Sequence, residues 1–150
     1  AADADAFLVT VLKTHNSARA RYGARPLQWN GFLAPRVEQY ARMCKYAHSD
    51  AQSRYGENLH ASIDPNTDME SAMTSWMSEA SKYNYNQPGF SSATGKFTQV
   101  VWKNTTQVAC GIARCPAGAI FAQPSTLIVC RYTPPGNFPG QFPQNVGRPV

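Results

Sequence analysis

Three ionisable residues of this chain, His48, Glu57 and Glu79, occupy positions where the surrounding sequence predicts burial or a close approach of the backbone. His48 and Glu79 lie on or beside the apolar faces of predicted helices, where an ionisable group is costly unless a partner neutralises it. Glu57 lies between a glycine and an asparagine at the start of a predicted strand, where the backbone can approach a cavity closely. Imidazole and carboxylate groups can exchange protons or hold a metal ion, so these residues form the first candidate site.

Hydrolysis would need more than this cluster, namely an activated nucleophile or a metal-bound water. Neither G-x-S-x-G nor H-E-x-x-H occurs in the sequence. Ser49, Ser75 or Ser78 could pair with His48, but nothing in the sequence orients the imidazole as in a catalytic triad. Two interpretations stay open: a buried polar cluster that fixes the fold, which we favour, and a hydrolase that acts through His48 and Glu57.

The cysteines form an even set, Cys44, Cys110, Cys115 and Cys130. Their spacing fits neither zinc motifs nor a thioredoxin-like C-x-x-C, since four residues separate Cys110 from Cys115. Disulfides formed in an oxidising compartment are the better interpretation. The sequence alone permits three pairings.

Amphipathic helices are predicted to position the first candidate site. One follows an apolar stripe over residues 8–22, where His15 is expected to be a hydrogen-bonded core histidine rather than a ligand. A second begins with Asn30 as its N-cap and carries Cys44 and His48 on its apolar face.

The third predicted helix opens with a capping box of Thr67 and Glu70. Its apolar stripe includes Trp76, and Glu79 lies three residues further on, on nearly the same side.

Strands are predicted over residues 55–63, 107–115 and 126–133, where β-branched residues and alternation occur. Residues 97–101 fit a helical turn as well as a strand. The last 17 residues contain five prolines and three glycines, so an irregular tail is expected, with Phe138 and Phe142 as possible anchors.

The chain of 150 residues fits one domain, with residues 1–133 as its core and residues 134–150 as an extension that packs on it or trails it. No run approaches the roughly 18 apolar residues of a membrane span. The apolar run near the start is too short for a signal-peptide core, so a mature, processed form of a secreted protein is expected. A monomer is also expected. The triplet at Asn104 is a glycosylation acceptor sequence, in agreement with secretion.

Positive charge dominates the second half of the chain, which has six Lys/Arg residues and no acidic residue after Glu79. A solvated basic surface is the simpler explanation. Attraction to anionic membranes or cell-wall polymers is the alternative. The arginines are scattered and no nucleic-acid motif occurs, so no nucleic-acid partner is expected.

Two stretches, GKFTQVVWKN at 95–104 and CRYTPPGNF at 130–138, resemble the signature motifs of the CAP superfamily of cysteine-rich secretory proteins, antigen 5 and pathogenesis-related protein 1. Segments 15–19, 46–48 and 56–59 agree in order and spacing. Residue patterns alone predict only a mixed α and β protein. The resemblance implies an α+β fold, a three-layer α-β-α sandwich with a short central antiparallel sheet.

Most members of that family have histidine where this chain has Lys96. The resemblance implies a cavity tetrad of His48, Glu57, Glu79 and Lys96. A protonated lysine has no lone pair for a metal, so we hypothesise that its ammonium supplies the positive charge that a metal supplies in relatives. No metal or other cofactor is expected, with His48 at most a weak ligand. The resemblance also implies disulfides Cys44–Cys110 and Cys115–Cys130.

The segment before the first signature carries Tyr83, Tyr85, Pro88 and Phe90, and its aromatic spacing resembles the caveolin-binding-type motif through which some CAP proteins bind sterols. Flat aromatic faces match a flat sterol, and the Pro88 turn would let the loop move. The alternative is that these aromatics only pack on the core. Some relatives bind fatty acids between two helices, for which the third predicted helix offers Met69, Met73 and Met77.

The expected function is therefore that of a secreted pathogenesis-related protein 1-like CAP protein, similar to fungal members, acting without catalysis as a binder or carrier of a sterol or, second, a fatty acid, in defence or virulence. Two alternatives remain. One is the hydrolase described above. The other is a precursor that releases a C-terminal signalling peptide starting at Thr133, because the proline-rich tail suits protease access.

Overall fold

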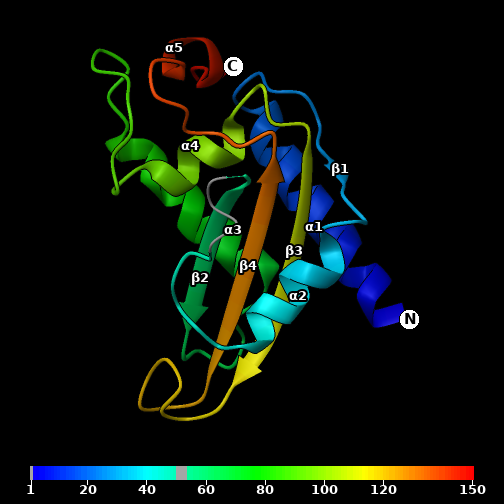
Figure 1. The fold of residues 1–150 in the computed structure, drawn as a ribbon. Helices are drawn as coiled ribbons and strands as arrows, with labels where there is room; N and C mark the ends of the chain where they lie inside the picture. The colour runs from blue at the N-terminus through cyan, green and yellow to red at the C-terminus, as the bar shows by residue number, and fades with distance from the viewer. Residues whose placement is uncertain (1, 50–53) are drawn as a thin grey trace.

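The computed structural model describes residues 2–49 and 54–150, which form three layers around a central sheet (Figure 1). Helix α2 covers one face of the sheet, and α1, α3 and α4 lie on the other face. The elements in chain order are α1 (Ala2–Ala20), β1 (Gln28–Trp29), α2 (Ala34–Arg42), β2 (Gly56–Ser62), α3 (Met69–Met77), the 3-10 helix η2 (Ser78–Lys82), α4 (Gly95–Val101), β3 (Gln107–Cys115), β4 (Ser125–Thr133) and α5 (Phe142–Asn145). The expected α+β sandwich is confirmed.

The sheet has the strand order β1-β3-β4-β2. β3 and β4 form an antiparallel hairpin, and β2 pairs antiparallel with the other edge of β4. The three predicted strands are confirmed. β1 adds a parallel edge of only two residues, which is too short to show periodicity in the sequence.

Alternation along the sheet produces two apolar cores, one on each face. On β4, Leu127 and Val129 pack with Val37 of α2, whereas Ile128 and Tyr132 pack on the α1–α3 side. Helix α2 approaches β3 so closely that a Cβ atom at Gly111 would lie 2.6 Å from the backbone of Glu38. A larger residue would therefore push α2 away from the sheet.

The second predicted helix is shorter than expected, because α2 ends at Arg42. Cys44 adopts a positive φ of 56°, which directs the chain away from the helix axis. Cys44 and His48 therefore do not lie on a helical face, and that prediction is wrong. The predicted N-cap is also wrong, because Leu33 is the N-cap of α2; the Asn30 side chain instead accepts hydrogen bonds from the amides of Phe32 and Leu33 in the turn before the helix.

The start of the third helix was also misassigned. Asp68, not Thr67, is the N-cap of α3, and its capping-box partner is Ser71 rather than Glu70. The hydroxyl of Thr67 instead donates to the carbonyl of Asp64 in the preceding turn.

All four cysteines are in disulfides, but the pairing is Cys44–Cys115 and Cys110–Cys130, so the expected connectivity is wrong. The register of the β3–β4 hairpin decides this, because it places Cys110 directly opposite Cys130 with their Cα atoms 4.1 Å apart. Cys115 lies at the far end of β3, where the segment after α2 brings Cys44 to a Cα distance of 5.7 Å.

The C-terminal segment packs against α4 and the loop that precedes it (Figure 1). Phe142 is fully buried and meets Trp102 edge to face at a centroid distance of 4.9 Å. Phe138 is 53% exposed and does not anchor the tail. Among the helices of residues 2–49 and 54–150, none combines the length and the apolar character of a membrane-spanning segment.

Candidate functional site

Glu57 is held by a network that involves three other residues. The register of β2 with β4 places Glu57 opposite Arg131, whose Nε donates to Oε2 at 2.9 Å. His48 Nδ1 donates to Oε1 at 3.0 Å, and Ser49 donates through its amide to Oε1 at 2.8 Å and through its hydroxyl to Oε2 at 2.7 Å. The Glu57 side chain is 0% exposed. Each carboxylate oxygen thus accepts two hydrogen bonds.

These hydrogen bonds determine the charge of Glu57. Burial acts to raise the pKa of the carboxyl, but the bonds from His48, Ser49 and Arg131 outweigh burial and lower the pKa to about 2. The carboxylate is therefore ionised, and all its lone pairs accept hydrogen bonds. It has no free lone pair with which to act as a base or to bind a metal.

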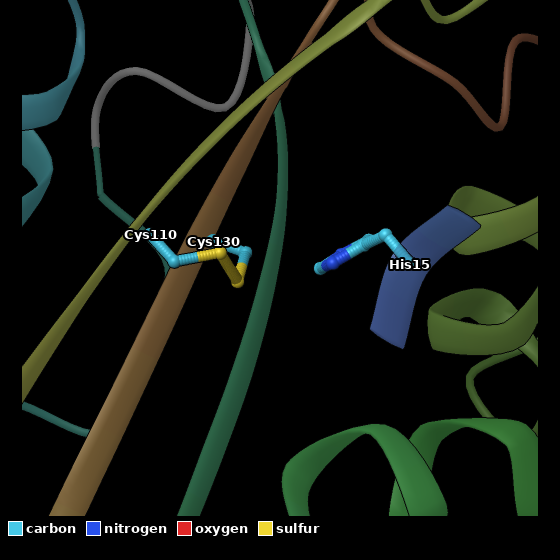
Figure 2. A group of neighbouring side chains, drawn as sticks. All are labelled: His15, Cys110 and Cys130. Atoms are coloured by element: carbon cyan, nitrogen blue, oxygen red, sulfur yellow. A yellow bond between two sulfur atoms is a disulfide. The ribbon is translucent and has the colours of Figure 1, made fainter. Parts of the chain in front are cut away.

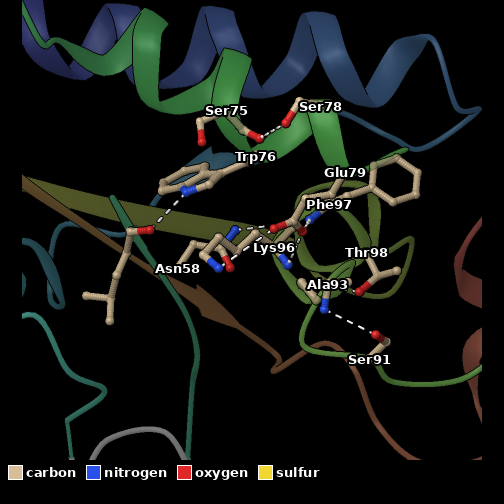
Figure 3. Close-up of polar contacts among 12 residues, drawn as sticks. Asn58, Ser75, Trp76, Ser78, Glu79, Ser91, Ala93, Lys96, Phe97 and Thr98 are labelled. Carbon is tan, nitrogen blue, oxygen red and sulfur yellow. Dashed lines mark hydrogen bonds and ion pairs between the residues drawn. The ribbon is translucent and has the colours of Figure 1, made fainter. Parts of the chain in front are cut away.

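Glu79 and Lys96 form a second, separate pair (Figure 3). Glu79 Oε1 accepts hydrogen bonds from the amides of Lys96 at 3.0 Å and Phe97 at 3.1 Å, so this carboxylate caps the start of α4. Lys96 Nζ lies 3.7 Å from Glu79 Oε2. The four residues of the expected tetrad therefore lie in two separate groups: His48 with Glu57, which Arg131 also contacts, and Glu79 with Lys96.

A cavity of about 330 Å³ lies beside both pairs. His48, Glu57 and Lys96 line it, together with Asn58 and Phe90. Glu79 is not part of its lining, because the carboxylate is turned to the α4 amides. Three of the four tetrad residues thus share one cavity.

The donor set of this cavity does not fit zinc, which takes three or four N, O or S ligands from a protein. Glu57 is saturated, Glu79 is bound to two amides, and Lys96 has no lone pair while protonated. His48 Nδ1 is used as a donor to Glu57, so Nε2 is the remaining nitrogen ligand of this set.

One other group of potential metal ligands occurs among the described residues: His15, Cys110 and Cys130 (Figure 2). Both sulfur atoms are joined in a disulfide, so neither is a thiolate. His15 Nδ1 donates to the carbonyl of Val11 at 2.8 Å, and Nε2 accepts from the hydroxyl of Tyr132 at 2.7 Å. Burial lowers the pKa of His15 to about 4, and the expectation of a neutral, hydrogen-bonded core histidine is confirmed.

Two of the three serines considered as nucleophiles, Ser49 and Ser78, donate their hydroxyls to other groups. The hydroxyl of Ser49 donates to Glu57, and that of Ser78 donates to the carbonyl of Ser75 at 2.6 Å (Figure 3). The arrangement is therefore not that of a nucleophile activated by His48.

The aromatic residues of the loop over residues 83–90 lie in two different places. Tyr83 packs in the core and meets Tyr85 edge to face at 4.8 Å. The Tyr85 hydroxyl donates to the carbonyl of Gly147 at 2.7 Å, and a small cavity of about 260 Å³ between loop and tail is lined by Tyr83, Tyr85 and Pro88. Phe90 instead borders the central cavity and is 65% exposed.

Arg131 was missed by the sequence analysis. An arginine within the otherwise apolar run of β4 was the available signal, but only the β2–β4 register reveals its partner. Asn104 lies where expected for a glycosylation acceptor, exposed between α4 and β3.

Residues 12–132 match the family described as "CAP: Cysteine-rich secretory protein family". The chain is 35% identical to pathogenesis-related protein 1 of Arabidopsis thaliana over 136 residues, which cover 88% of this chain and 79% of the relative. It is 38% identical to the human Golgi-associated plant pathogenesis-related protein 1 over 144 residues, which cover 91% and 89%. Among solved structures, MpPR-1i matches with a TM-score of 0.69 at 23% identity, covering 89% of this chain and 91% of that one. The sequence match and the shared fold together show that this chain belongs to the CAP family.

Proposed function

We propose that this CAP protein is extracellular and binds a lipid without catalysis, with a sterol held by the aromatic loop. The observation that carries the proposal is the exposure of Phe90 on a loop that projects from the body of the fold (Figure 1). A large exposed apolar side chain is a favourable contact for a flat apolar ligand.

The loop contacts the C-terminal segment through Tyr85. Tyr85 donates one hydrogen bond to Gly147, and the Arg148 guanidinium lies 4.6 Å from the Tyr85 ring centre. The cavity between them, about 260 Å³, is small for a sterol, since sites for ligands of that size measure roughly 300–1,000 Å³. Binding would therefore displace the loop. The burial of sterol surface, at about 25 cal/mol per Å², would offset the lost contacts.

The test is a titration with radiolabelled cholesterol and ergosterol of the wild type and of a Tyr85→Ala/Phe90→Ala variant. We expect saturable binding that the double variant loses. Phe138→Ala is the matched control, because Phe138 is also an exposed aromatic residue but lies outside the loop. Equal binding by all three proteins would place the ligand elsewhere, and no binding by the folded wild type would refute the sterol proposal.

A fatty acid is the second candidate, favoured by a groove of about 340 Å³ between α1 and α3. Met73 and Met77 contribute apolar surface, while Lys13 and Arg21 offer positive charge for a carboxylate. Of the three methionines named above, Met69 is fully buried and is core. Met77→Asp should weaken palmitate binding and leave cholesterol binding unchanged. Unchanged palmitate binding together with weaker cholesterol binding would show that the fatty acid does not bind in this groove.

Support for a non-catalytic role comes from Glu57, whose hydrogen-bonded carboxylate is a poor base. Measured hydrolysis of ester or peptide substrates that His48→Ala abolishes would contradict this. The peptide-precursor alternative is disfavoured, because Tyr132 is fully buried in β4, which pairs with a strand on each side. A protease would have to unfold the sheet to cut after Tyr132.

The extracellular assignment is supported by the two disulfides, since disulfides persist in oxidising compartments. The names of the plant relatives associate them with pathogenesis, so we place the proposed lipid binding in defence or virulence. Detection of the protein in culture fluid, with its disulfides intact by mass spectrometry, would test the location.

A further inference from the structure

The ammonium of Lys96 lines the central cavity and is only loosely paired with a carboxylate. Lys96 Nζ lies 3.7 Å from Glu79 Oε2, beyond normal hydrogen-bond length, and its side chain is 36% exposed. Within the described part of the chain, this ammonium makes no hydrogen bond, although it has three donors.

Both carboxylates near Lys96 are already stabilised by other groups. Glu57 is paired with Arg131 at 2.9 Å and saturated by hydrogen bonds. Glu79 receives two amide hydrogen bonds at the start of α4. The donors of Lys96 are therefore available to a ligand. The field of Lys96 extends into its surroundings, since burial and then the Lys96 charge lower the pKa of His60.

His48 restricts where an anion can lie. Because Nδ1–H donates to Glu57, Nε2 is the one nitrogen of His48 that remains open to the cavity, and 45% of the side chain is exposed. The Lys96 ammonium offers three donors, so the Lys96 side of the cavity is the favourable one for a negative group.

The same cavity has an apolar boundary. Phe90, which is largely exposed, contributes its ring, and Pro135 adds further apolar surface. A volume of about 330 Å³ is at the lower end of the range for small-molecule sites. The combination suits a small molecule with one charged end and one apolar end.

We propose that the central cavity binds a small organic carboxylate, which accepts hydrogen bonds from the Lys96 ammonium while its apolar body packs on Phe90. This site is distinct from the α1–α3 groove and from the cavity lined by Tyr83 and Tyr85, but it shares Phe90 with the proposed sterol-binding loop.

The experiment is a calorimetric titration of the whole protein with sodium benzoate and with benzamide, its neutral isostere. Benzoate should bind saturably and at least about tenfold more tightly than benzamide, as expected for a charge-assisted hydrogen bond. This comparison needs no variant, so it does not depend on the folding of a mutant. Equal affinity for the two ligands, or no benzoate binding, would overturn the proposal.

Lys96→Met removes the charge and should weaken benzoate binding about tenfold or more, with cholesterol binding unchanged. Lys103→Met is the matched control, because Lys103 is exposed and lines a different cavity. Its benzoate affinity should stay within about twofold of the wild type. Circular dichroism confirms that both variants are folded. Equal losses in the two variants, or none in Lys96→Met, would refute binding at Lys96.

Discussion

Replacement of Glu57 by glutamine is the sharpest test of the buried ion pair. The change keeps the shape of the side chain but removes the charge that faces Arg131, whose side chain is only 8% exposed. Removing one partner of a buried pair costs about 3–5 kcal/mol, because the other charge is left uncompensated. We therefore expect Glu57→Gln to lower the free energy of unfolding by that amount at pH 7.

The pKa of Glu57 gives an independent estimate. Its value falls from 4.5 to about 2 on folding, and at 1.36 kcal/mol per unit this corresponds to about 3 kcal/mol of stability. Because the folded-state pKa is the lower one, this contribution is present above pH 4.5 and is lost as the pH falls towards 2. At pH 2 the protonated glutamate resembles glutamine, so the two proteins should converge in stability.

The assay is urea unfolding of the disulfide-intact protein, followed by the fluorescence of buried Trp76 and Trp102, at several pH values from 7 to 2. The matched control is Glu38→Gln, since Glu38 pairs with Arg42 on the surface, where the two side chains are 51% and 70% exposed. Such a pair contributes about 0.5 kcal/mol or less.

Two results would refute this reasoning. A difference between wild type and Glu57→Gln that stays constant from pH 7 to pH 2 would show that the charge of Glu57 is not responsible. A Glu57→Gln variant as stable as Glu38→Gln at pH 7 would show that Arg131 is not left uncompensated.

Three further predictions concern other parts of the fold. Lys96→His should raise the affinity for zinc in calorimetry, because a second imidazole nitrogen adds to Nε2 of His48, water completes the coordination in place of the unavailable carboxylates, and the ammonium is removed; equal zinc affinity of variant and wild type would contradict this. Tyr132→Phe should destabilise the protein by about 1–3 kcal/mol in urea unfolding, because Nε2 of His15 loses its buried partner. Asp68→Ala should cost about 0.5–2 kcal/mol through the loss of the α3 N-cap, and an unchanged unfolding midpoint would argue against that cap.

The sequence by itself determined the family, the layered fold and most of its elements. The signature motifs and the apolar periodicities are local properties of the chain, and they predicted the three main strands and the helices on both sides of the sheet. The apolar stripe correctly placed His15 in a buried hydrogen-bonded position, and the family resemblance implied the tetrad, of which three residues line one cavity.

The tertiary structure alone decided which residues pair with which. The disulfide connectivity and the Glu57–Arg131 pair both follow from strand register, which joins residues 20 and 74 positions apart. The end of α2 depends on the positive φ of Cys44, and no residue type near Cys44 predicts this conformation. Register and loop direction are set by the packing of the whole sheet, so no local pattern in the sequence contains them.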